Sequence, residues 1–383
     1  MSVSTAGFSG KGVRSDCQIA LADSLTGSTI LEVQSSVQAM YGEAIRTQIL
    51  SLLEQFQAPP LKVTVQDSGA LPFVIAARLE AALAMHLEGR LPALGLSFVR
   101  SERAKRSRRS RLYVPGSTPK LLPSIGLYGA DSIILDLEDS VSPDQKLPAL
   151  ALVRRALTAV DFGRSEKLVR VNSGSQGLKE IEELLLACPD GFVLPKVESA
   201  EDVLAAASAL DGQDGRSVLI PIIESARGLH FAYEIASCHP SVAALALGIE
   251  DYLADTGAAK TERGGMVEFA VCSLVNSCRA AGVSPLGPIF SQVDDEEGMK
   301  AFAARMADLG CDGVGCLHPR QIEPVHLGMR PGDAALTQAS AIIEAFSQVQ
   351  GNGEGVVSLN GRMIDPPVTA QARRVLERGG ISL

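Results

Sequence analysis

The chain has 383 residues, of which 46% are hydrophobic and 21% charged, and its formal net charge is −9. A chain of this size can bury a large core without disulfide or metal staples, and its acidic balance argues against nucleic acid or an anionic membrane as a partner. Its seven cysteines form no CxxC pair, which indicates free thiols in a reducing compartment. No stretch resembles a signal peptide or a membrane span, so we expect a cytoplasmic protein.

The N-terminal part, residues 1–97, is predicted to be a small α+β domain. Short segments alternate apolar and polar residues as strands do, and longer segments repeat apolar residues at helical spacing. The predicted strands are 19–23, 29–37 and 61–65, and the predicted helices are 41–56 and 73–87. About ninety residues of this kind are enough for an independently folding domain.

A basic segment at 98–110 follows this domain. Seven of the thirteen residues from position 99 to position 111 are Lys or Arg, and no aromatic residue lies among them. This composition favours a solvated linker. A local patch for phosphate or RNA is the alternative, but the lack of stacking residues and the acidic chain weigh against it.

Residues 111–330 are predicted to form a (β/α)8 barrel. Eight short apolar runs are mostly separated by helical stretches rich in Ala and Leu, a pattern typical of a parallel sheet. The predicted strands are 111–115, 132–138, 167–172, 191–198, 217–224, 242–251, 283–290 and 312–319. An open, doubly wound sheet is the alternative, but no GxGxxG turn follows the first strand. A helical extension is expected at 331–383.

Charged residues stand at the carboxyl ends of these strands, where a barrel carries its active site. Glu224 and Asp251 end neighbouring strands, and paired carboxylates with water are a typical magnesium site. Arg170 lies in an otherwise apolar strand, where a guanidinium needs an anion. The anion that pairs with Arg170 is either Glu138 or Asp139, in a structural salt bridge, or a carboxylate of the substrate. Strand ends that merely face solvent are the simpler explanation for each acid.

The motifs of the barrel resemble the β subunit of citrate lyase, a member of the HpcH/HpaI aldolase family, and related malyl- and citramalyl-thioester lyases. The matching stretches are RLYVPGSTP, IILDLEDSV, LVRVNS, VLPKVES, IIESARGL, LALGIEDYLADTG, GPIF and LHPRQIEPV. The resemblance implies cleavage of a citryl or similar 3-hydroxyacyl thioester to an acetyl thioester and a 2-oxo acid such as oxaloacetate. It also implies that Glu224 and Asp251 bind Mg²⁺ and that Arg111 and Arg170 bind substrate carboxylates.

The N-terminal domain resembles the acyl carrier (γ) subunit of citrate lyase through SSVQAMYGEAIR and SGALPFVIAARLEAAL. Ser15 then matches the serine that carries a phosphoribosyl-dephospho-CoA arm, although Arg14 and Lys11 replace the usual acidic context. An unmodified loop serine is the alternative. The resemblance further implies a citrate lyase α-like acyltransferase subunit as a partner.

The C-terminal sequence LNGRMIDPPVTAQARRVL resembles a flap whose aspartate, here Asp365, reaches an active site, often that of a neighbouring subunit. Asp365 is then a catalytic acid alongside Glu138 and Asp139, and the protein a homo-oligomer. An ordinary helix N-cap would explain Asp365 equally well. Two other functions stay open: cleavage of free citramalyl-CoA or malyl-CoA with an idle carrier domain, and a non-catalytic scaffold.

Overall fold

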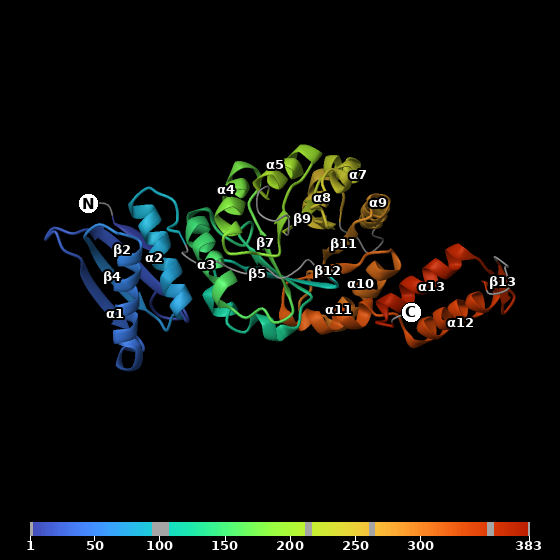
Figure 1. Cartoon of the computed structure of the whole chain (residues 1–383), viewed down its shortest axis with the longest axis horizontal. Helices are drawn as coiled ribbons and strands as arrows, with labels where there is room; N and C mark the ends of the chain where they lie inside the picture. The colour runs from blue at the N-terminus through green and yellow to red at the C-terminus, as the bar shows by residue number, and fades with distance from the viewer. Residues whose placement is uncertain (1–2, 94–106, 211–216, 260–264, 351–355, 382–383) are drawn as a thin grey trace.

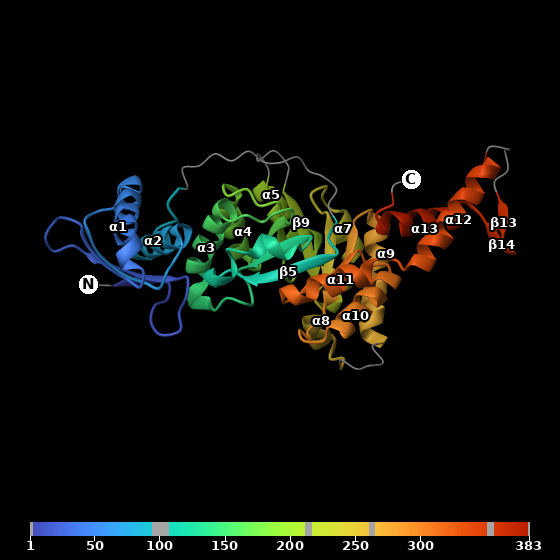
Figure 2. The same ribbon diagram turned by 90° about the horizontal axis from the view of Figure 1, so that it is seen from below.

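The computed structural model describes residues 3–93, 107–210, 217–259, 265–350 and 356–381. Three parts follow one another along the chain: a small domain with a sheet, a barrel ringed by helices, and a helical hairpin. They lie in the same order along the long axis of the molecule, as Figures 1 and 2 show from two directions. Among the described residues, no helix combines the length and apolarity that crossing a bilayer requires.

The N-terminal domain is a four-stranded sheet with two helices, in the strand order β1-β2-β4-β3. Its elements are β1 (Ser4–Ala6), β2 (Cys17–Asp23), β3 (Ile30–Ser35), α1 (Gln38–Gln55), β4 (Leu61–Asp67) and α2 (Pro72–His86). Strand β4 pairs with β2 antiparallel and with β3 parallel. The predicted α+β domain is confirmed, and the sequence pattern missed β1 because three residues are too few to show alternation.

The barrel is closed and parallel, with the strand order β5 to β12. Its strands are β5 (Ser110–Pro115), β6 (Ser132–Asp136), β7 (Glu166–Arg170), β8 (Gly191–Leu194), β9 (Val218–Ile223), β10 (Ala244–Leu247), β11 (Ser284–Ile289) and β12 (Gly313–Cys316). The predicted (β/α)8 barrel is therefore confirmed, and the open-sheet alternative is wrong.

Helices connect the strands and surround the barrel (Figure 1). They are α3 (Lys146–Ala159), α4 (Gly174–Leu185), α5 (Ala200–Leu210), α6 (Ala226–His230), α7 (Ala232–Ser237), α8 (Ile249–Thr256), α9 (Gly265–Ala281), α10 (Glu296–Asp308) and α11 (Ile322–Met329). Short 3₁₀ turns in the described part of the barrel lie at Pro119–Leu121, Ile125–Tyr128, Pro143–Gln145 and Pro319–Gln321.

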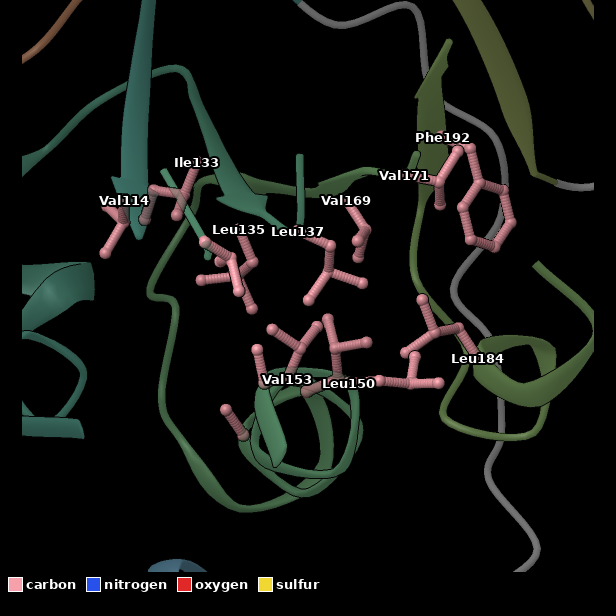
Figure 3. Packing of buried hydrophobic residues seen from close by; sticks show 14 of the residues in the cluster. Val114, Ile133, Leu135, Leu137, Leu150, Val153, Val169, Val171, Leu184 and Phe192 are labelled. Carbon is pink, nitrogen blue, oxygen red and sulfur yellow. The ribbon is translucent and has the colours of Figure 1, made fainter. Parts of the chain in front are cut away.

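The alternation of side chains along each strand divides the barrel core into two shells. Outward-facing residues such as Leu135 pack against Leu150 and Val153 of α3, as Figure 3 shows. Inward-facing residues such as Ile134 and Leu168 fill the interior of the barrel. Because both shells are largely apolar, the strands read as hydrophobic runs, and most of their charged groups stand where the strands end.

Ion pairs close the barrel at the amino-terminal ends of its strands. Arg108 donates to the buried carboxylate of Glu166 over 2.8 and 2.6 Å, and Arg109 donates to Asp131 over 2.8 and 2.9 Å. These arginines fall in the segment 98–110, for which the composition predicts a solvated linker. That interpretation is wrong for Arg108, whose side chain is 9% exposed, whereas Arg109 pairs with Asp131 and keeps 41% of its side chain exposed. The earlier part of the linker lies outside the described residues.

The same end of the barrel holds a titratable histidine. His326 Nε2 lies 2.8 Å from Ser110 Oγ and 3.6 Å from Asp131. Burial, together with the positive charge of Arg109, lowers the pKa of His326, and Asp131 opposes this only in part. The folded chain therefore binds fewer protons than the unfolded chain as the pH falls through about 6.5.

The contribution of His326 to stability should consequently fall as the pH drops from 7 towards 5, by at most about 1.4 kcal/mol per pH unit. His326→Gln should remove this fall, so that the free energy of unfolding at pH 5, relative to its value at pH 7, is higher in the variant than in wild type. Urea unfolding at several pH values measures this, and His230→Gln, at an exposed position, is the control. Equal pH dependence in wild type and His326→Gln would contradict the prediction.

The C-terminal part is a helical hairpin made of α12 (Asp333–Gln350), β13 (Val357–Leu359), β14 (Arg362–Ile364) and α13 (Pro366–Arg378). Its two helices pack through a small apolar cluster that includes Leu336 and Leu376. Arg378 Nη1 donates to the carbonyl of Ala307 near the end of α10, over 3.3 Å. Helix α10 leads into the start of β12, so the hairpin leaves the barrel at the end opposite to the carboxyl ends of the strands (Figures 1 and 2).

Candidate active site

Strand register places the carboxyl ends of neighbouring strands at one level, which we call the rim. Asp136, the last residue of β6, is the register partner of Arg170, the last residue of β7. Ile223 at the end of β9 pairs with Leu247 at the end of β10. The side chains that follow these ends therefore face the same mouth of the barrel, as predicted for a (β/α)8 enzyme.

Arg170 is the cation at the centre of the rim. Its Nε and Nη2 donate to both oxygens of Asp136, over 2.7 and 2.8 Å. Its guanidinium also lies over the Tyr113 ring, 5.4 Å from the centroid. Burial alone would lower the pKa of Arg170, but the hydrogen bonds and charge of Asp136 outweigh it and raise the pKa. Asp136 and Tyr113 thus hold the guanidinium in one orientation.

Glu138 and Asp139 also face Arg170. Arg170 Nη1 lies 2.9 Å from Glu138 Oε2, close enough for an ion pair but out of line for a hydrogen bond, and 3.6 Å from Asp139. Lys196 donates to the other Glu138 oxygen over 2.9 Å. Burial raises the pKa of Glu138, although Lys196 and Arg170 oppose this. Asp139 is exposed at the mouth. The predicted salt bridge of Arg170 is present, and it leaves Asp139 facing solvent.

Lys196 adopts a left-handed backbone conformation, with φ of 54°. This conformation is costly for a residue with a Cβ, and such strain is typical of functional sites. In this conformation the exposed ammonium group of Lys196 donates its hydrogen bond to the buried carboxylate of Glu138.

Glu224 and Asp251 form the opposite side of the cluster. Glu224 directly follows β9, and Asp251 lies in the first turn of α8, which follows β10. Burial, then the charges of Asp251 and Glu138, raise the pKa of Glu224 to about 8. Gly248 leaves room for this carboxylate, because a Cβ there would lie 2.5 Å from Glu224 Cγ. Glu224 therefore follows a strand end directly, whereas Asp251 lies in the helix turn after the neighbouring strand and not at the end of the predicted strand 242–251.

The rim holds more negative than positive charge. Among the residues that the structure describes, Arg170 and Lys196 are the cations that act on the carboxylates of Asp136, Glu138, Asp139 and Glu224, and Asp251 adds a further negative charge beside Glu224. Among the described residues, no Lys or Arg forms an ion pair with Glu224. A cation between Glu224 and Asp251 would offset this excess. Within the described residues no group of three His, Cys, Asp or Glu could hold a metal ion alone, but magnesium needs only one or two carboxylates when substrate and water complete its shell.

The structure does not bring Arg111 to this cluster. It is the second residue of β5, four positions before the end of the strand, and its side chain is 2% exposed. Arg111 Nη2 donates to the carbonyl of Gly287 over 2.6 Å, whereas Nε and Nη1 have no hydrogen-bond partner in the described part of the chain. Burial lowers the pKa of Arg111. Its guanidinium thus lies inside the barrel, below the rim.

Two further predicted residues lie away from the rim of the same chain. Asp365 is half-buried at the amino terminus of α13 and accepts a hydrogen bond from the Val368 amide over 3.1 Å, so the expected N-cap geometry is present. Ser15 lies in the N-terminal domain, half-buried, with a left-handed φ of 59°. Its amide donates to the carbonyl of Ser68 over 3.1 Å, which fixes the loop in front of β2.

Both domains of the chain match known protein families. Residues 109–319 match the family model described as HpcH/HpaI aldolase/citrate lyase, and residues 5–85 match the model described as malonate decarboxylase delta subunit. Citrate lyase subunit beta of Haemophilus influenzae is 38% identical over 280 residues, covering 71% of this chain and 96% of the relative. The chain belongs to the HpcH/HpaI aldolase/citrate lyase family. It is a carbon–carbon lyase whose barrel is preceded by an acyl-carrier-like domain.

Other relatives of this lyase differ in their named substrates. L-malyl-CoA/beta-methylmalyl-CoA lyase of Cereibacter sphaeroides is 32% identical over 301 residues, covering 71% of this chain and 95% of the relative. The CitE protein of Mycobacterium tuberculosis, solved with magnesium, acetoacetate and coenzyme A, has a TM-score of 0.61 and 28% identity and covers 72% of this chain and 98% of its own. A citrate lyase beta subunit from the same organism was solved with oxaloacetate and magnesium, with a TM-score of 0.52, 28% identity and coverage of 59% of this chain and 98% of its own.

Three residues that shape the site of this lyase are not among those that the sequence pattern predicts. The sequence predicts that Glu138 or Asp139 forms the salt bridge with Arg170, but the two parallel hydrogen bonds of Arg170 go to Asp136. The alternation in RLYVP could have identified Tyr113, because it puts Tyr113 on the inner face of its strand. Gly248 gives no sequence signal, since only the packed structure shows how closely its Cα approaches Glu224.

Proposed function

We propose that this lyase is magnesium-dependent and cleaves a citryl or similar 3-hydroxyacyl thioester, carried on its own N-terminal domain, to an acetyl thioester and a 2-oxo acid such as oxaloacetate. The observation that carries the proposal is the excess of carboxylates over cations at the rim, with Glu224 directly after β9 and Asp251 in the helix turn that follows the neighbouring β10. The magnesium complexes of the Mycobacterium tuberculosis relatives support the choice of cation.

Glu224 and Asp251 would hold the magnesium ion. Bound there, the ion would act as a Lewis acid that lowers the pKa of the substrate hydroxyl. Arg170, held by Asp136, would bind a carboxylate of the substrate at the mouth and fix its orientation. Because Arg111 lies inside the barrel, we assign carboxylate binding to Arg170 alone.

The reaction itself is a retro-aldol cleavage. The substrate hydroxyl loses its proton to a base, and Glu138 and Asp139 are the carboxylates beside Arg170 that are placed to accept it. The oxygen electrons form the carbonyl of the 2-oxo acid while the carbon–carbon bond breaks. The electron pair of that bond stays on the thioester fragment as an enolate. An acid then protonates the enolate carbon to give the acetyl thioester.

We assign that last proton to Asp365 of a neighbouring chain. The hairpin that carries Asp365 leaves its own barrel at the end opposite to the rim. A second copy can bring its hairpin to the rim, which its own chain cannot do in this arrangement. The proposal therefore requires a homo-oligomer in which each active site is shared between two chains.

Ser15 would carry the acyl arm, and a citrate lyase α-like acyltransferase subunit would load it. The match of residues 5–85 to a carrier-type family model supports this. Cleavage of free CoA thioesters is the second candidate, favoured by the malyl-CoA lyase relative and by the coenzyme A bound to the Mycobacterium tuberculosis protein.

Intact mass and a substrate panel distinguish the two candidates. We expect protein purified from its native host to carry a phosphoribosyl-dephospho-CoA adduct that Ser15→Ala lacks. We also expect carrier-bound citryl thioester to release a 2-oxo acid in the presence of magnesium, and chelation to stop the release. An unmodified Ser15 together with rapid turnover of malyl-CoA or citramalyl-CoA would favour the second candidate. Ser9→Ala, in the same domain, is the matched control.

A further inference from the structure

Charged side chains are buried between the N-terminal domain and the barrel. Helix α2 packs along α3, and Glu80 of α2 is 0% exposed. Its carboxylate accepts hydrogen bonds from Arg154 over 2.9 Å and from Arg155 over 2.7 Å. Arg154, 1% exposed, also donates to the carbonyl of Pro92 over 2.7 Å. Buried charges are costly without partners, and both oxygens of Glu80 find theirs across the contact between the two domains, whereas Arg154 also pairs with Glu183 of the barrel over 3.3 Å.

A second buried arginine extends this contact to the rim. Arg78 donates to both oxygens of Asp16 over 2.9 and 3.0 Å. It also donates to the carbonyls of Pro148 over 3.3 Å and Ser117 over 3.5 Å. Ser117 follows the carboxyl end of β5, and Pro148 lies in the first turn of α3, which follows β6. Arg78 therefore joins the loop of the carrier-like domain to the rim of the barrel.

Ser15 precedes Asp16 in that loop. We propose that the N-terminal domain delivers its acyl group while it stays docked on its own barrel, held there by the contacts of Glu80 and Arg78. An acyl group on Ser15 then enters the active site of the same chain, and the domain does not have to dissociate from the barrel. The proposal rests on the carrier role given above. It identifies the α2–α3 surface as the docking site of the carrier and Glu80, Arg78 and Arg154 as positioning residues.

The burial of these pairs is what favours a docked carrier over a swinging one. Separating α2 from α3 would expose Glu80 and its two arginines, and Glu80 would lose both of its ion-pair partners, while Arg154 would keep only Glu183. By contrast, the ion pair of Lys62 and Glu32 on the same domain is about half exposed and does not involve the barrel. Docking also keeps a tethered substrate at a high effective concentration near the rim.

The test compares Glu80→Gln with Glu32→Gln, which removes an acid from the exposed pair of the same domain. Hydrogen exchange of the full, unloaded chain reports docking directly. We expect the amides at the α2–α3 contact to exchange at least tenfold faster in Glu80→Gln, and the Glu32→Gln control to match wild type. Arg154→Gln, which breaks the same contact from the barrel side, should reproduce the effect. Because this variant leaves the sequence of the carrier domain unchanged, the same result would show that faster exchange does not come from misfolding of that domain.

Activity is then measured with two substrates. Glu80→Gln should cleave a free CoA thioester at the wild-type rate but cleave the acyl group loaded on Ser15 at least tenfold more slowly. Wild-type turnover of the loaded group in a chain whose α2–α3 amides are exposed would overturn the proposal. Unchanged exchange in both Glu80→Gln and Arg154→Gln would overturn it as well. If the loaded wild-type chain fails while the free thioester is cleaved, the carrier role is refuted, and delivery with it, but the lyase assignment stands.

Discussion

Replacing Glu224 by Gln is expected to lower kcat at least about 100-fold and to weaken magnesium binding. Gln keeps the shape of the side chain in the space that Gly248 leaves open, but removes the charge that a divalent cation requires. Asp251→Asn should act in the same direction, because Asp251 lies in the helix turn after the neighbouring strand and its charge acts on Glu224. The measurements are steady-state kinetics of 2-oxo acid release and calorimetric titration with magnesium.

The control for this prediction is Glu201→Gln, an exposed acid in the first turn of α5 that lies outside the rim cluster. It should leave kcat and magnesium affinity unchanged. Full activity of Glu224→Gln and Asp251→Asn would mean that the two carboxylates hold no metal. That outcome would refute magnesium-dependent cleavage at this rim and return the scaffold alternative to consideration.

Replacing Asp365 by Asn should lower kcat about 10²- to 10⁴-fold, the usual contribution of a general acid. Asn at a helix N-terminus still accepts the hydrogen bond from Val368, so α13 should keep its stability. Mixing inactive Asp365→Asn with inactive Glu224→Gln should restore up to about a quarter of wild-type activity, since random assembly pairs an intact rim with a neighbouring intact hairpin in a quarter of the sites.

Asp333→Asn, at the start of α12 and outside the tip of the hairpin, is the matched control and should retain full activity alone. Mixtures that stay inactive even though the two variants exchange subunits, which native mass spectrometry can follow, would exclude sharing of the active site between chains. Full activity of Asp365→Asn itself would show that Asp365 is not the catalytic acid and serves only as the N-cap of α13.

The sequence is sufficient to predict the fold because the relevant signals are local. A strand buried on both faces reads as an apolar run, and the helices between such runs read as amphipathic stretches, so eight strands can be located without knowledge of their contacts. The same regularity places Glu224, Asp251 and Arg170 at or near strand ends. Closure of the parallel barrel then brings these ends together at one rim.

Interactions between distant segments are harder to predict. Arg108 and Arg109 resemble part of a solvated linker, because nothing near them in sequence reveals that Glu166 and Asp131 lie in the barrel wall as their partners. Arg111 begins the motif RLYVP, and only its position along the folded strand shows that it lies inside the barrel.

The chain by itself therefore determined its family, its barrel and the kinds of residue at the mouth, since these depend on apolar periodicity and on motifs within a few residues of each other. The tertiary structure decided which acid holds Arg170, on which side of the barrel the hairpin of Asp365 leaves, and how Glu80 docks the carrier-like domain. Each of these is a contact between segments far apart in sequence, where charge and geometry are matched only after the chain has folded.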